Sequence, residues 1–71
     1  MFAMMSVLSS TISAIGYDEE GMVLRVSFKS GDLYEYYDVP SALYLEFKSS
    51  TSLGKFLHAR IKDKYRFQKI S

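Results

Sequence analysis

The chain has 71 residues, of which 48% are hydrophobic, 24% charged and 15% aromatic, and its formal net charge is +1. A chain of this length forms one domain at most and buries only about 60% of the surface that its unfolded form exposes, so self-association would help to stabilise it. It has no cysteine, which excludes disulfides, zinc thiolate sites and cysteine nucleophiles and fits a cytoplasmic location.

The first eight residues, "MFAMMSVL", form an apolar leader without a basic segment before it. This leader does not fit a signal peptide and is much too short to span a bilayer, so we expect no membrane contact. We expect residues 1–8 to be strand-like or loosely attached, the core of the single domain to cover about residues 10–66, and residues 67–71 to form a tail.

Three short segments with β-strand character come next, ending near Asp18, Lys29 and Val39. Turn residues separate them, "DEEG" after the first and "SGD" after the second. In the second segment, "MVLRVSFK", apolar residues alternate with residues of a mostly polar face. Strands at such short spacing predict an antiparallel meander.

The hairpin loop before the third strand decides which way its tyrosines face, because a slip of one residue turns every side chain to the other face. With a two-residue loop, Tyr34 and Tyr36 would share a face with Arg25 and Lys29. That face would be an aromatic and basic platform of the kind that binds single-stranded nucleic acid.

A three-residue loop with its glycine in the left-handed conformation pairs Val26 with Tyr34 and places Tyr34 and Tyr36 under the helices. We favour this register, because the other one would put Glu35 opposite Val26 in the core, where a carboxylate without a partner is costly. Tyr34 and Tyr36 are then buried or half-buried, with hydroxyls that reach a partner or the rim. Tyr37 is then the exposed aromatic residue.

From Pro40 onward the hydrophobic spacing is that of helices. Val39, Leu43 and Phe47 recur every four residues, which predicts a short helix with Pro40 in its first turn. The hydroxyl residues of "STS" offer N-caps for a second helix over about residues 53–64. The tail "YRFQKIS" alternates weakly and fits either a fourth short strand or an ordered extension. The predicted fold is α+β, a three-stranded antiparallel meander packed on two short C-terminal helices in the order β-β-β-α-α.

Several ordered patterns along the chain are shared with a known family. They are "ISAIGYD" (12–18), "LRVSF" (24–28), a glycine, Tyr34-x-Tyr36, Val39-Pro40, Ser52-Leu53-Gly54 and Ile61. With this set the chain resembles the KTSC domain, which is named for its occurrence at the C-terminus of some lysyl-tRNA synthetases and also exists as small stand-alone proteins in bacteria and phages. The resemblance implies that Tyr34, Tyr36, Val39, Pro40 and Gly54 are structural motif residues, and the synthetase context suggests RNA binding. Leu57 and His58 depart from the family, whose members often carry an aromatic and a small polar residue there.

Positive charge is concentrated at the C-terminal end, where residues 55–71 hold six of the nine Lys and Arg residues against the single acid Asp63. Flexible cations along one edge suit phosphate contacts, and interleaved aromatics suit stacking on bases. A solvated helix face with cations near its C-terminus would explain the same charges. We predict a non-enzymatic accessory module that binds RNA or another polyanion through Lys55, Arg60, Lys62, Lys64 and Arg66, with Tyr37 and Tyr65 as stacking residues.

Two alternative functions use other features of the chain. A bacterial or phage module for self-assembly, or for binding a host factor, would use apolar residues: Phe2, Met4, Met5, Val7, Leu8, Val23 and Tyr37. A small nucleotide could instead be held in the cleft of an oligomer near Gly54 and Lys55. The "STSLGK" segment lacks the spacing of a phosphate-binding P-loop, so we interpret it as a capped helix.

No residue pattern predicts catalysis, a cofactor or a metal site. His58 is the only histidine and has neither a cysteine nor a carboxylate at helical spacing to share a metal. The serine and threonine clusters have no base that the sequence places beside them. We therefore expect a small cytoplasmic protein without enzymatic activity.

Overall fold

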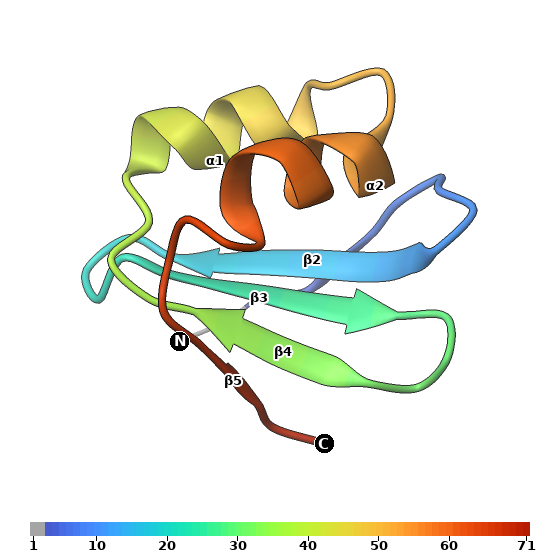
Figure 1. Cartoon of the computed structure of the whole chain (residues 1–71), viewed down its shortest axis with the longest axis horizontal. Helices are drawn as coiled ribbons and strands as arrows, with labels where there is room; N and C mark the ends of the chain where they lie inside the picture. Colours follow the sequence, from blue (N-terminus) through green and yellow to red (C-terminus); the bar gives the residue numbers. More distant parts are fainter. Residues whose placement is uncertain (1–2) are drawn as a thin grey trace.

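The computed structural model, which describes residues 3–71, consists of one antiparallel sheet with helices over one face (Figure 1). The strands lie across the sheet in chain order and are β1 (Met5–Ser6), β2 (Ile12–Asp18), β3 (Val23–Phe28), β4 (Leu33–Tyr36) and β5 (Phe67–Lys69). Between β4 and β5 come helix α1 (Ser41–Lys48), helix α2 (Leu53–Phe56) and a π-helical turn, η1 (Leu57–Ile61), that continues α2. No helix within residues 3–71 is long and apolar enough to cross a membrane.

The fold is α+β as predicted, but its sheet has five strands and not three, and the helices are followed by a strand. Part of the leader forms β1, with Met5 opposite Ile15, and the tail forms β5, with Phe67 opposite Tyr36. These outer strands have only two and three residues. Segments that short carry almost no periodicity, so their backbone pairing with a neighbouring strand defines them.

The β3–β4 hairpin has the three-residue loop that the sequence predicts. Val26 lies opposite Tyr34 and Leu24 lies opposite Tyr36. Gly31 has a φ of +102°, a conformation that glycine adopts readily and other residues avoid. Tyr36 is therefore only 3% exposed and Tyr34 is half-buried, which confirms their inward orientation.

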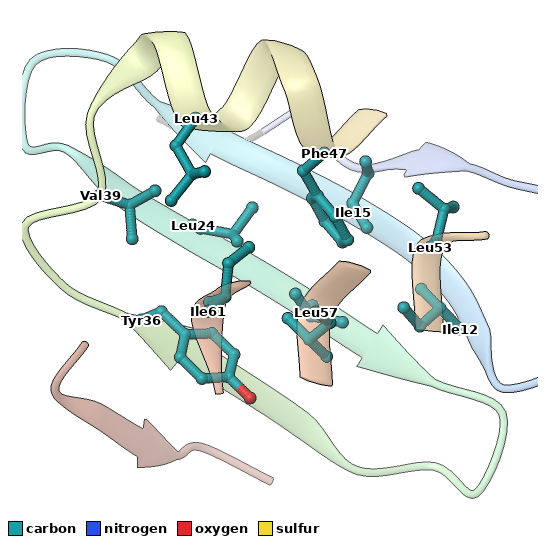
Figure 2. Close-up of a cluster of buried hydrophobic side chains, with 11 residues drawn as sticks. Ile12, Ile15, Leu24, Tyr36, Val39, Leu43, Phe47, Leu53, Leu57 and Ile61 are labelled. Carbon is teal, nitrogen blue, oxygen red and sulfur yellow. The ribbon is translucent and has the colours of Figure 1, made fainter. Parts of the chain in front are cut away.

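The core lies between the sheet and the helices (Figure 2). Strand β3 contributes alternate residues, β2 contributes Ile12 and Ile15 on either side of a register shift, and the helices contribute residues four positions apart. Its buried members are Ile12, Ile15, Leu24, Val26, Tyr36, Val39, Leu43, Phe47, Leu53, Leu57 and Ile61. The strand alternation and the helical spacing predicted from the sequence are both confirmed by this set.

The Val39-Pro40 corner joins the sheet to α1. Pro40 precedes the helix in an extended conformation, and its carbonyl accepts hydrogen bonds from the Leu43 and Tyr44 amides of α1, so it lies just before the first turn. The Tyr17 hydroxyl of β2 donates to the Val39 carbonyl, and the Tyr17 ring stacks on that of Tyr44 at 4.6 Å between centroids. These contacts fix α1 against β2.

Candidate functional site

A groove of about 570 Å³ lies between η1 and the hairpin end of the sheet. Aromatic residues of β3 and β4 line it from the sheet, and α2, η1 and the residue after η1 line it from the helical layer. Its lining residues are Ser10, Thr11, Phe28, Lys29, Ser30, Asp32, Tyr34, Tyr36, Gly54, Leu57, His58 and Lys62. The groove therefore combines a flat apolar floor with cations and hydroxyls at its edges.

The floor of the groove is part of a ladder of aromatic rings. Phe28 meets Tyr34 edge-on, with centroids 5.6 Å apart, and Tyr34 is roughly parallel to Tyr36 at 6.3 Å. Phe67 of β5 lies 5.8 Å from both tyrosines. Such ring pairs hold one another in fixed orientations. The ladder thus presents a pre-organised apolar surface to the groove.

The Tyr36 side chain is buried but keeps a polar end. Burial raises the pKa of its hydroxyl, and Tyr34 and Asp63 raise it further. No hydrogen bond links this hydroxyl to any other group within residues 3–71, and no described side-chain polar atom is buried without a partner. Because its pKa is raised, the hydroxyl is protonated at neutral pH. Because Tyr36 lines the groove, the hydroxyl is accessible from there.

At the groove, α2 comes close to the segment before β2. A Cβ atom at position 54 would lie 2.9 Å from Thr11 Oγ1, so only glycine permits this approach without a shift. The helix begins with the predicted cap, because the Ser52 side chain accepts a hydrogen bond from the Lys55 amide at 3.4 Å. Gly54 thus serves the packing of α2, as the capped-helix interpretation predicts.

The two arginines of the predicted site already have acidic partners. Arg60 lies 3.6 Å from Glu46 and over the Phe56 ring, and Arg66 lies 3.4 Å from Asp38 and over the Tyr37 ring. These pairs are largely exposed, so each contributes little to stability. They nevertheless balance the arginine charges locally.

The lysines of the predicted site are available to a partner. Lys55, Lys62 and Lys64 are exposed, and none of them forms a salt bridge within residues 3–71. Lys62 lines the groove together with Lys29, which is also exposed and forms no salt bridge in this part of the chain. Unbalanced positive charge therefore surrounds the groove.

A second, shallow hollow of about 590 Å³ collects four predicted site residues, Tyr37, Lys64, Tyr65 and Arg66, with Asp63, Phe67 and Gln68. Tyr37 is half-buried and not the exposed aromatic residue that the sequence predicted. Its hydroxyl lies 3.2 Å from carboxylate or amide oxygens of Glu35 and Gln68. Burial is also the main cause that raises its pKa. Strand β5, one of the two alternatives that the sequence left open for the tail, is the reason, because it brings Gln68 beside Tyr37.

The structure thus separates the predicted site residues into groups. Tyr34, Tyr36, Gly54 and Lys62 line the groove, whereas Lys55 and Arg60 line neither hollow. The sequence did not indicate that Phe28, Lys29 and Thr11 contribute to a groove. The alternation of β3 predicts that Phe28 points inward, but nothing local predicts that Phe28 lines the same groove as Thr11 and the exposed His58.

Within residues 3–71, no three His, Asp or Glu side chains gather as a metal ion would require. The carboxylates instead pair with cations. Arg25 and Glu35 form a hydrogen-bonded ion pair across β3 and β4, and Lys69 lies 3.4 Å from Asp32 at the edge of the groove. The Asp32 charge is therefore balanced within the protein.

Comparisons with known proteins agree over nearly the whole chain. Residues 8–65 match the model of the KTSC domain family. A protein of Tsukamurella paurometabola is 35% identical over 63 residues, covering 89% of this chain and 94% of that protein. A crystal structure of a KTSC domain protein from Yersinia pestis is 34% identical, with a TM-score of 0.96 and full coverage of both chains. The lysine–tRNA ligase of Nostoc punctiforme is 29% identical over 70 residues, which are 99% of this chain but only 12% of the ligase.

Proposed function

The chain belongs to the KTSC domain family, and from this premise we propose that it is a non-enzymatic accessory module that binds single-stranded RNA in the cytoplasm. The lysine–tRNA ligases that contain a similar segment have tRNA as a substrate by name. An RNA contact would be a natural use for a segment appended to such an enzyme. That context supports the choice of RNA among polyanions.

The observation that carries the proposal is a set of exposed lysines without salt bridges within residues 3–71, one of which lines an aromatic groove. Lys55, Lys62 and Lys64 follow one another along the segment that covers the sheet, and Lys62 lines the groove itself. Lysines that neutralise phosphates release counterions, and this effect supplies most of the affinity for a polyanion. Bases that stack on aromatic rings add affinity with little dependence on sequence.

The charge balance determines how strong the binding is. Arg60 and Arg66 contribute less than the lysines, because Glu46 and Asp38 already balance their charges. With three phosphate contacts on a single strand, the logarithm of the affinity should fall with the logarithm of the salt concentration with a slope of about −2. We therefore expect weak binding that is readily lost as salt rises.

The test is a fluorescence anisotropy titration of labelled single-stranded RNA at low and moderate salt. Lys62→Glu and Lys64→Glu should each weaken binding, because each replaces a phosphate contact with a repulsive charge. Lys48→Glu is the matched control, since Lys48 is exposed on α1 and its reversal changes the net charge equally. Absence of binding at low salt, or an equal loss in all three variants, would refute a site at the lysines.

A protein-interaction role has one observation in its favour, the apolar surface at the β1 edge. Met4 and Met5 are 40% and 44% exposed and Leu8 is fully exposed. Of the other residues assigned to this role, Val7, Val23 and Tyr37 are half-buried and Phe2 lies outside the described residues. A dimer in sedimentation velocity that is lost when residues 1–8 are deleted would favour self-assembly over RNA binding.

A further inference from the structure

The groove has the dimensions and composition of a small-molecule site. Its volume of about 570 Å³ falls within the range of ligand pockets, roughly 300–1,000 Å³. Such pockets are mainly apolar and contain a few polar groups that fix the orientation of the ligand. Here Phe28, Tyr34, Tyr36 and Leu57 supply apolar surface, and hydroxyls and cations lie around them.

The aromatic floor leaves room for one flat ligand ring. Tyr34 is half-buried, with Phe28 against it edge-on and Tyr36 and Phe67 beside it, so its remaining exposed surface faces the groove. An added ring would continue the existing ladder. Stacking on such a ring suits any nucleobase, because each base has a π-face.

Two tyrosine hydroxyls in the groove have no partner among the described residues. Tyr34 and Tyr36 form no side-chain hydrogen bond within residues 3–71, whereas the hydroxyls of Tyr17 and Tyr37 are hydrogen-bonded. Figure 2 shows the Tyr36 ring extending away from Val39, with its hydroxyl on the far side of the ring. These hydroxyls and that of Thr11 offer hydrogen bonds to the polar groups of a ligand.

The charge of the groove selects an anionic ligand. Lys29 and Lys62 line it without a salt bridge in the described part of the chain, and the one lining carboxylate, Asp32, is balanced by Lys69 at 3.4 Å. A purely apolar ligand would leave these cations unused, and a cationic ligand would be repelled. A ligand with a flat ring, hydroxyls and a phosphate matches the aromatic floor, the hydroxyls and the two lysines of the groove.

We propose that the groove holds one nucleoside monophosphate unit, with its base against Tyr34 and its phosphate toward Lys29 and Lys62. The unit is either a free nucleotide or one unstacked nucleotide of a strand, and the strand-bound form rests on the proposed RNA-binding function. In the strand-bound form Lys29 and Lys62 contact the phosphate of the nucleotide in the groove, and Lys64 contacts the phosphate of a neighbouring nucleotide. Single-stranded binding proteins combine a basic track with stacking rings in this way.

The test is an NMR titration of the isotope-labelled protein with AMP, UMP, adenosine and inorganic phosphate. AMP should shift the signals of the groove residues Thr11, Tyr34 and Gly54. Tyr34→Leu should weaken AMP by about fivefold or more, since stacking supplies the base contact. Lys29→Glu, at an exposed position where the fold is preserved, should weaken AMP but not adenosine. Tyr44→Phe, at a residue of α1 that does not line the groove, should change neither.

The outcomes separate this inference from the RNA-binding proposal. If RNA binds through Lys62 but AMP leaves the groove signals unchanged and Tyr34→Leu keeps full RNA affinity, the nucleotide site is wrong and RNA binding stands. If AMP binds in the groove and RNA does not bind at all, the site stands for a free nucleotide and the RNA proposal fails. Inorganic phosphate binding as tightly as AMP, or AMP binding that is unchanged in Lys29→Glu, would overturn the proposed orientation.

Discussion

Removal of the Tyr17 hydroxyl tests the contact that holds α1 on the sheet. In Tyr17→Phe the ring keeps its stack on Tyr44 at 4.6 Å, and only the hydrogen bond to the Val39 carbonyl is lost. Val39 is fully buried, so its carbonyl is left without this donor away from water. A typical hydrogen bond contributes about 0.5–1.5 kcal/mol, and a buried acceptor without a partner costs about 1–3 kcal/mol. We expect the free energy of unfolding to fall by about 1–2 kcal/mol.

The assay is equilibrium urea unfolding at neutral pH, with a thermal scan beside it. For a domain of this size, Tm should fall by about 4–8 °C for each kcal/mol lost. Tyr44→Phe is a matched control, because the Tyr44 hydroxyl makes no hydrogen bond within residues 3–71 while its ring keeps the same stack. Equal stabilities of the two variants would show that the contact to Val39 contributes nothing.

The same hydroxyl predicts a dependence on alkaline pH. Burial raises the pKa of Tyr17, and the carboxylates of Glu19 and Asp18 raise it further. An unfolded tyrosine ionises near pH 10, so the unfolded chain loses its proton first as pH rises. The contribution of Tyr17 to stability is therefore complete below about pH 10 and is lost above it. Tyr17→Phe should therefore lose less stability than the wild type between neutral and alkaline pH. Part of the loss should remain in the variant, because burial also raises the pKa values of Tyr36 and Tyr44.

Three further substitutions test the fold by urea unfolding. Gly31→Ala should destabilise the hairpin by about 1–2 kcal/mol, because the φ of +102° places a Cβ in a strained conformation; no change would argue against the three-residue loop. Phe47→Ala removes a fully buried ring and should cost about 3–5 kcal/mol, enough to unfold much of so small a domain. Ser52→Ala removes the α2 cap and should cost about 1 kcal/mol, whereas Ser49→Ala, at an exposed residue whose side chain makes no capping hydrogen bond, should cost less.

The sequence predicted the interior better than the edges of the molecule. The β3–β4 register followed from Glu35 and the alternation of β3, because a one-residue slip would have buried a carboxylate. The sequence left the leader open as strand-like or loosely attached and the tail open as a fourth short strand or an extension, because two or three residues are too few to show a clear period. The error at Tyr37 follows from this, because its burial depends on a neighbour in β5.

The candidate site was predicted as a set of cations with two stacking aromatics, Tyr37 and Tyr65. The sequence shows the cations, but Arg66 and its partner Asp38 lie 28 positions apart, so their pairing appears only in the folded chain. The groove likewise joins the segment before β2, the β3–β4 hairpin and the turn after α2. Neither hydrophobic spacing nor short motifs report contacts between three distant segments.

The order of the strands also bears on how the chain folds. The strands β1 to β4 each pair with the next strand in sequence, so these pairings require the closure of short loops only. The pairing of β4 with β5 must instead enclose residues 37–66, which contain both helices. Long-range closure costs more chain entropy than a hairpin turn. We therefore infer that the meander and the helices nucleate folding and that β5 docks late, so the rings of Tyr34 and Tyr36 are the last part of the core to be covered.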